Sequence, residues 1–405
     1  MRNSCSLDSP LWIQAMKNLF TEEASNGKNL VYSPLSIYTA LGLLASGSKG
    51  ETLDELLGFL KSRNLDSLNV FCSQLMKSLN ETQLSLVNSV WVEKSCDLNP
   101  KFREVADSIF GAHVQSVDFR HEANAARLMV NQWVETKTNA LIKDLMPEGS
   151  VSDTASVLLV NALYFKGLWH NGQFEKSLTK NSKFYLLDGH SSVEVPFMTS
   201  TEYQYISYQN GFKVLTLPYK IKTEKKSRYG RMSDNPFDFR ARRFSMHIIL
   251  PDRRDGLEEL IDFASTDSAS FLDKYIPKYA SVKRTGEFKV PKFKITFDFD
   301  AKRILSELGL VVPFSSEADF TEMLSGNGSI DKVIHKCFVE VDEEGTEGAA
   351  ATLIEFLECS MGGPPRPPPP VVDFVADHPF MFIIRDDITG VLLFSGYILN
   401  PLLSS

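Results

Sequence analysis

The segment from Glu343 to Thr352 limits what this chain can fold into more than any other stretch. It reads Glu-Glu-Gly-Thr-Glu-Gly-Ala-Ala-Ala-Thr and has no apolar stripe with helical spacing. Side chains this small can stay in water as a loop, or fit between two strands without steric conflict. The segment therefore reads either as a strand that can be inserted into a sheet, or as an Ala-rich surface loop or short helix.

Alternation along a strand makes the first reading more specific. Successive side chains of a strand face opposite sides of a sheet. One face would then carry only uncharged side chains, those of Thr346, Gly348, Ala350, Thr352, Ile354 and Phe356. Both charges between residues 346 and 357 would lie on the other face, where water can reach them. The alternation ends at Glu358, so we place the end of an insertable strand near that residue.

Hydrophobic periodicity divides the rest of the chain into early helices and later strands. Apolar residues recur at three- and four-residue steps, as in an amphipathic helix, in 11–20, 35–46, 52–61, 67–79 and 123–143. Runs rich in β-branched and aromatic residues are typical of strands and cover 84–92, 156–165, 203–208, 244–250, 286–297, 337–341, 380–385 and 391–397. This order predicts an α+β fold rather than an alternating α/β fold.

Composition and the missing motifs exclude several functions. The net charge of −8 argues against a nucleic-acid-binding protein. The sequence contains no window of 18 apolar residues, so we expect no membrane-spanning helix. Five irregularly spaced cysteines predict neither a disulfide framework nor a metal site, so we expect no metal and no cofactor. The motifs of hydrolases and nucleotide-binding enzymes are missing, so we expect no catalytic residues. The N-terminus has no apolar segment of signal-peptide type, which favours a cytoplasmic or nuclear protein, with the extracellular space as the alternative.

Four blocks of sequence resemble the serpin family of serine protease inhibitors. They are 29–60 (NLVYSPLSIYTALGLLASGSKGETLDELLGFL), 160–174 (VNALYFKGLWHNGQF), 335–347 (HKCFVEVDEEGTE) and 373–401 (DFVADHPFMFIIRDDITGVLLFSGYILNP). The sequences at 146–149, 186–189 and 196–200 resemble those of the plant serpins most. The resemblance implies a single domain over 1–405. It also implies three β-sheets, eight or nine helices and an exposed reactive loop at about 343–372.

The resemblance also assigns roles to particular residues. The hinge of the loop is implied to be Glu343, Glu344, Gly345, Thr346, Glu347, Gly348, Ala349, Ala350, Ala351 and Thr352. Glu343 is implied to pair with Lys292, with Trp169 packed nearby. A hydrogen-bonded cluster beneath the point where the central sheet opens is implied for Ser33, Ser36, Asn161 and His335.

The function implied is single-use inhibition of a protease by loop cleavage and insertion. Counting from the hinge places the scissile bond at Cys359-Ser360, or one residue earlier at Glu358-Cys359. Neither bond offers arginine or lysine, so small-residue serine proteases or papain-like cysteine proteases are the expected covalent partners. We expect a monomer that can form loop-sheet polymers.

Three departures from the family pattern favour a non-inhibitory binding, storage or chaperone protein as the rival. These are Gly348, where alanine is usual, the region 323–334, which is shorter than the family norm, and the unusual Cys359 at the expected scissile bond. A basic insertion at 220–243, with nine Lys or Arg against three Asp or Glu, reads as a solvated loop or as a polyanion site.

Overall fold

The structure is a computed structural model, which describes residues 11–80, 84–165, 167–170, 173–220, 244–266, 268–276, 282–325, 330–345 and 371–404. Within these ranges lie nine α-helices: α1 (Leu11–Glu23), α2 (Pro34–Ser46), α3 (Gly50–Phe59), α4 (Leu65–Asn80), α5 (Pro100–Phe110), α6 (Phe119–Lys137), α7 (Leu257–Thr266), α8 (Ser268–Tyr275) and α9 (Ala301–Glu307). The predictions for 346–370 and for 221–243 lie outside the described residues.

The described strands form three sheets. The central sheet has the order β12 (Phe293–Asp300), β13 (Ile330–Val341), β4 (Val157–Phe165), β2 (Leu84–Glu93), β3 (His113–Val117). The largest has the order β1 (Leu30–Tyr32), β16 (Leu392–Ile398), β15 (Phe380–Asp386), β9 (Phe244–Pro251), β8 (Phe212–Pro218), β7 (Gln204–Tyr208), β10 (Val282–Lys283). The smallest has the order β14 (Val372–Val375), β11 (Thr285–Pro291), β6 (Ser192–Met198), β5 (Lys180–Tyr185).

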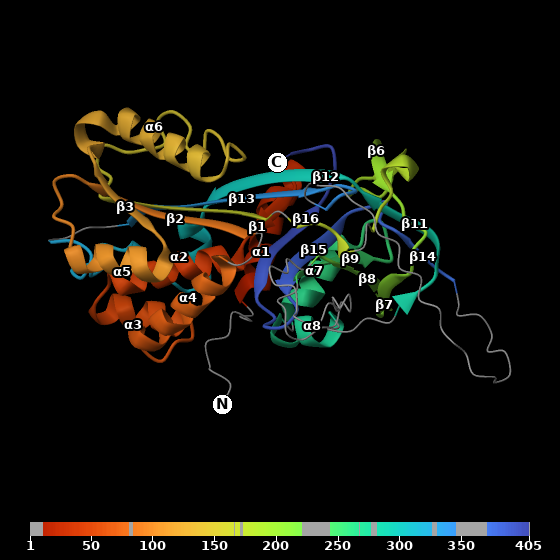
Figure 1. The fold of residues 1–405 in the computed structure, drawn as a ribbon, viewed down its shortest axis with the longest axis horizontal. Coiled ribbons are helices and arrows are strands. Elements are labelled where there is room, and N and C mark those ends of the chain that lie inside the picture. The colour runs from red at the N-terminus through yellow and green to blue at the C-terminus, as the bar shows by residue number, and fades with distance from the viewer. Residues whose placement is uncertain are drawn as a thin grey trace, which may run out of the picture.

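Helices cover both faces of the central sheet. Figure 1 shows α6 lying across one face, with α2, α3, α4 and α5 gathered on the other. The core under α6 contains Trp91 of β2, Leu158 of β4 and Phe338 of β13. A second and larger core fills the space between the three sheets and the remaining helices. Because both faces are covered, β4 is apolar on both sides without alternation, except at Asn161.

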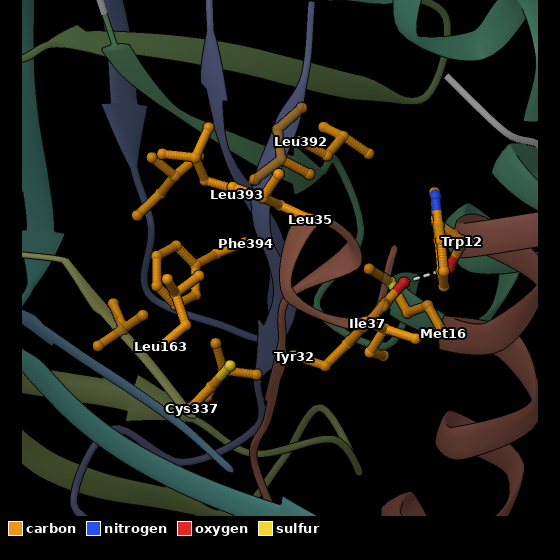
Figure 2. Packing of buried hydrophobic residues seen from close by; sticks show 14 of the residues in the cluster. Trp12, Met16, Tyr32, Leu35, Ile37, Leu163, Cys337, Leu392, Leu393 and Phe394 are labelled. Carbon is orange, nitrogen blue, oxygen red and sulfur yellow. Dashed lines mark hydrogen bonds between the residues drawn. The ribbon is translucent and has the colours of Figure 1, made fainter. Parts of the chain in front are cut away.

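The first strand joins this larger core to the N-terminal helix. Tyr32 of β1 is fully buried, and its hydroxyl donates a hydrogen bond to the backbone oxygen of Trp12 in α1. Figure 2 shows Tyr32 beside Ile37 of α2, with Phe394 of β16 packed nearby. Burial raises the pKa of Tyr32, so the phenol stays protonated and can donate this bond.

Two of the differences from the sequence prediction have a clear physical reason. The predicted helix 123–143 ends six residues early, at Lys137 of α6, because the chain reverses where Asn139 and Ala140 take positive φ angles of 51° and 61°. The predicted strand 286–297 is two strands in two different sheets, β11 and β12. They are separated by Lys292 alone.

Candidate functional site

The described chain leaves β13 through a tight turn at residues 342–345. Asp342 and Gly345 exchange backbone hydrogen bonds of 3.3 Å each, and Gly345 has a φ of +104°. A Cβ atom on Gly345 would lie 2.3 Å from the backbone oxygen of Gly167. Both the conformation and the space therefore require glycine at this position.

The turn is held against the segment that follows β4. The backbone N–H of Trp169 donates to the oxygen of Glu344 over 3.2 Å, and its indole N–H donates to the oxygen of Asp342 over 2.8 Å. The indole of Trp169 stacks on the ring of Tyr219, with centroids 4.6 Å apart and planes at 15°. Trp169 is 3% exposed, so the turn packs against a buried aromatic side chain that is held in place by stacking.

The carboxylate of Glu343 is the best-satisfied charge in this turn. Lys292 Nζ donates to its Oε2 over 2.7 Å, and Thr179 Oγ1 donates to its Oε1 over 2.6 Å. Burial acts to raise the pKa of Glu343, but these two hydrogen bonds outweigh it and the pKa is lowered. The structure thus brings together the pair that the resemblance implied, and adds Thr179, which sequence reasoning missed.

Lys292 owes its position to the break between two strands. Pro291 ends β11 in the smallest sheet, and Phe293 begins β12 in the central sheet. The backbone N–H of Lys292 donates to Pro196 of β6 over 2.9 Å. This anchor fixes the lysine where the two sheets meet, within reach of the end of β13.

A second group of buried polar side chains crosses the middle of the central sheet. Asn161 of β4 lies opposite His335 of β13 on one side and opposite Asn88 of β2 on the other. Beneath them Ser33 caps the N-terminus of α2, and its hydroxyl accepts a hydrogen bond from the N–H of Ser36 over 3.0 Å. All five side chains are buried, and none is more than 3% exposed.

Every polar atom of Asn161 in this network has a partner. Its Oδ1 accepts from His335 Nδ1 over 2.9 Å and from the hydroxyl of Ser36. Its Nδ2 donates to the backbone oxygen of Ser36 over 3.1 Å and to Asn88 Oδ1 over 2.5 Å. The network therefore joins β13, β4, β2 and α2 without an unpaired buried group on Asn161.

Hydrogen bonding defines the tautomer of His335. The N–H of Ser33 donates to His335 Nε2 over 3.0 Å, so this nitrogen accepts and the proton sits on Nδ1. Burial lowers the pKa of His335 to about 3, so the imidazole is neutral at physiological pH. The thiol of Cys337 lies 3.1 Å from the same Nε2, and burial raises its pKa.

Sequence reasoning placed four members of this network together but missed Asn88. The available signal was an amide in the apolar run 84–92, where a polar side chain needs a buried partner. Predicted site residues 346–352 and 358–360 lie outside the described part of the chain. The described residues contain no group of three or more potential metal ligands. None of the described helices is long and apolar enough to cross a membrane.

Residues 13–401 match the sequence model of the serpin (serine protease inhibitor) family. The chain belongs to the serpin family. It is 42% identical to Serpin-Z1C of Triticum aestivum over 392 residues, which cover 94% of this chain and 92% of that protein. It is 38% identical to Serpin-ZX of Arabidopsis thaliana over 416 residues, covering 99% of each.

A solved plant serpin has the same fold. The structure of Arabidopsis AtSerpin1 in its native stressed conformation superposes with a TM-score of 0.85 at 37% identity, covering 99% of each chain. The insect serpin Serpin48 of Tenebrio molitor gives a TM-score of 0.79 at 27% identity, covering 97% of each. The predicted α+β serpin fold, with three sheets, and the resemblance to plant serpins are confirmed.

Proposed function

We propose that this plant-type serpin is an inhibitor that traps a protease by inserting its cleaved loop between β4 and β13. The observation that carries the proposal is the position of Gly345. It forms an isolated antiparallel bridge with Leu168, just past the end of β4, while its own chain has just left β13. The described chain therefore ends, at Gly345, beside the neighbouring ends of β4 and β13.

Strand direction favours insertion at this place. β4 and β13 are parallel neighbours over residues 330–338 of β13. A strand that turns back from the end of β13 runs antiparallel to β13, and hence also antiparallel to β4. Insertion would replace one parallel pairing with two antiparallel pairings, which are slightly more stable per residue.

The free energy available can be worked from the inserted length. About a dozen residues from Thr346 onward would gain backbone hydrogen bonds worth about 1 kcal/mol each, so about 10 kcal/mol in total before side-chain burial is added. This equals the whole stability of a typical protease domain, which is about 5–15 kcal/mol. In this proposal the protease cleaves at Cys359-Ser360, or at Glu358-Cys359, and stays attached through the acyl bond to its nucleophile while it is distorted.

The hinge and the buried network have complementary roles in the proposal. The Glu343–Lys292–Thr179 contacts hold the turn closed at the top of the two strands. The Asn161–His335 hydrogen bond ties the same two strands together at mid-sheet. Opening the sheet requires this bond to break, and a small network can form new hydrogen bonds with the incoming strand.

The test is a covalent complex that survives denaturation. Papain and a small-residue serine protease are each incubated with the protein, and the products are separated by denaturing electrophoresis. A band at the summed mass supports inhibition and names the target class. A second arm uses Cys359→Arg, which offers trypsin a cleavable bond; cleavage by trypsin without any covalent complex would favour the rival non-inhibitory protein.

A further inference from the structure

Part of β2 lacks a neighbouring strand on its outer side. β2 pairs with β4 over 84–92, but with β3 only where Ser89–Glu93 lies opposite His113–Val117. No described strand pairs with the outer edge of Ser85–Asn88. Backbone N–H and C=O groups on such an edge can pair with another extended chain.

A cavity lies directly beside this open edge. Its volume is about 840 Å³, and residues 86–88 of β2 form one wall. The other walls come from α5, from residues 111–114 and from α6, so that β2, α5 and α6 surround the space. Cavities of about 300–1,000 Å³ are typical ligand sites, and this one has room for a short segment of chain.

Two stacked rings line the cavity, one from β3 and one from α6. The rings of His113 and Trp133 lie with centroids 5.1 Å apart and planes at 20°, and Trp91 packs its ring edge-on against both. A contact of 2.9 Å between His113 Nε2 and Gln115 Oε1 fixes the imidazole. Because the pair is held in place, it offers a preformed wall for another flat side chain.

Charges of both signs line the remaining walls. Arg103, Glu104 and Asp107 come from α5, and Lys137 follows Trp133 by one turn of α6. Among the described residues, none of these four forms an ion pair with another. The cavity can therefore meet both an acidic and a basic group of an occupant without first breaking a salt bridge.

We propose that this cavity binds a short extended peptide that adds as a strand to Ser85–Asn88. An aromatic side chain of the peptide packs against His113 and Trp133. A carboxylate of the peptide faces Arg103 or Lys137, and a basic group faces the acidic side chains of α5. Strand addition supplies affinity through the main chain, while the rings and charges select the side chains. The site is separate from the β4–β13 seam and does not depend on protease inhibition.

The probe is the acetylated and amidated tetrapeptide Lys-Phe-Val-Glu, titrated into the full chain by calorimetry. Hydrogen exchange is then followed by mass spectrometry with and without peptide. We expect one-to-one saturable binding, slower exchange in Ser85–Asn88, and about tenfold weaker binding of Lys-Ala-Val-Glu. Arg103→Glu should weaken binding about fivefold or more. The control Lys101→Glu makes the same charge change at an exposed position of α5 that does not line the cavity, and it should have no effect.

A filling variant gives a second, independent readout. Val114→Trp places a large side chain in the cavity and should abolish binding, and circular dichroism checks that each variant is folded. The proposal is wrong if the peptide does not bind at about millimolar concentration. It is equally wrong if hydrogen exchange slows only in β4 and β13, because the peptide would then insert between these two strands of the central sheet. Neither outcome bears on whether the protein inhibits a protease.

Discussion

The contacts of Glu343 yield the most specific prediction, because a matched control, Glu340, lies three residues earlier, on β13. The Glu343 side chain is 4% exposed and that of Lys292 is 31% exposed, with 2.7 Å between their charged atoms. Breaking a fully buried pair costs about 3–5 kcal/mol, and an exposed pair contributes about 1 kcal/mol or less. For this half-shielded pair we take about 2–3 kcal/mol.

Glu343→Lys does more than remove the pair. It places a second ammonium beside Lys292, and two like charges at 4 Å repel by about 4 kcal/mol at an effective dielectric constant of 20, before the side chains move apart. We expect a net loss of about 3–5 kcal/mol. With an unfolding entropy of about 2.1 cal/mol/K per residue, this corresponds to a fall in Tm of about 4–6 °C for a chain of this length.

The matched control is Glu340→Lys. Glu340 pairs with Lys294 over 3.5 Å, but both side chains are exposed, at 38% and 56%. The same substitution there should shift Tm by less than about 1 °C. Differential scanning calorimetry measures both variants. Native electrophoresis after warming should show polymers for Glu343→Lys alone, because its turn no longer holds the ends of β4 and β13 together.

A charge-swapped double variant, Glu343→Lys with Lys292→Glu, should recover part of the lost stability. A Glu343→Lys variant that keeps the wild-type Tm within about 1 °C and stays monomeric would contradict a stabilising role for the pair. Equal damage from Glu340→Lys would show that burial of Glu343 is not the cause.

Three further predictions concern the turn, the network and the hinge. Gly345→Ala should destabilise by about 2–4 kcal/mol and Gly309→Ala by less in chemical unfolding, because both have φ near +100° but only Gly345 lies against backbone. His335 is neutral when buried, and its pKa falls from 6.5 to about 3 on folding, so the unfolded state binds more protons between these values. The free energy of unfolding should therefore fall by up to about 1.4 kcal/mol per pH unit as pH drops from 6.5 towards 3. Denaturant titrations at several pH values should show that the unfolding free energy of His335→Gln depends less steeply on pH. Thr346→Arg puts a charge on the residue proposed to insert first between β4 and β13. It should convert the inhibitor into a cleaved substrate, seen as loss of the covalent band with cleavage retained.

Strong local patterns made most of the fold predictable. The strands β4, β9 and β16 were predicted to within a residue or so because burial on both faces keeps their sequences mostly apolar. The extent of β13 was underestimated, since Ile330–Lys336 mixes charged and apolar residues and has no clear strand pattern of its own.

Other features depended on contacts that no local pattern encodes. Pro291 and Lys292 mark a change of sheet, which depends on where β6 lies rather than on the sequence of 286–297. Thr179 became part of the site only because the chain brings residue 179 to residue 343. The positions of Glu343, Lys292, Asn161 and His335 followed from resemblance to a family, and their roles in insertion stay predictions.

The most direct test of the central claim is thermal unfolding before and after a single cut between residues 353 and 360, with the fragments mapped by mass. If the cleaved loop enters the seam between β4 and β13, the new strand should raise Tm by 10 °C or more, on the order expected for about 10 kcal/mol. An unchanged Tm after complete cleavage would mean that the loop stays outside the sheet, and the inhibitory account would be contradicted.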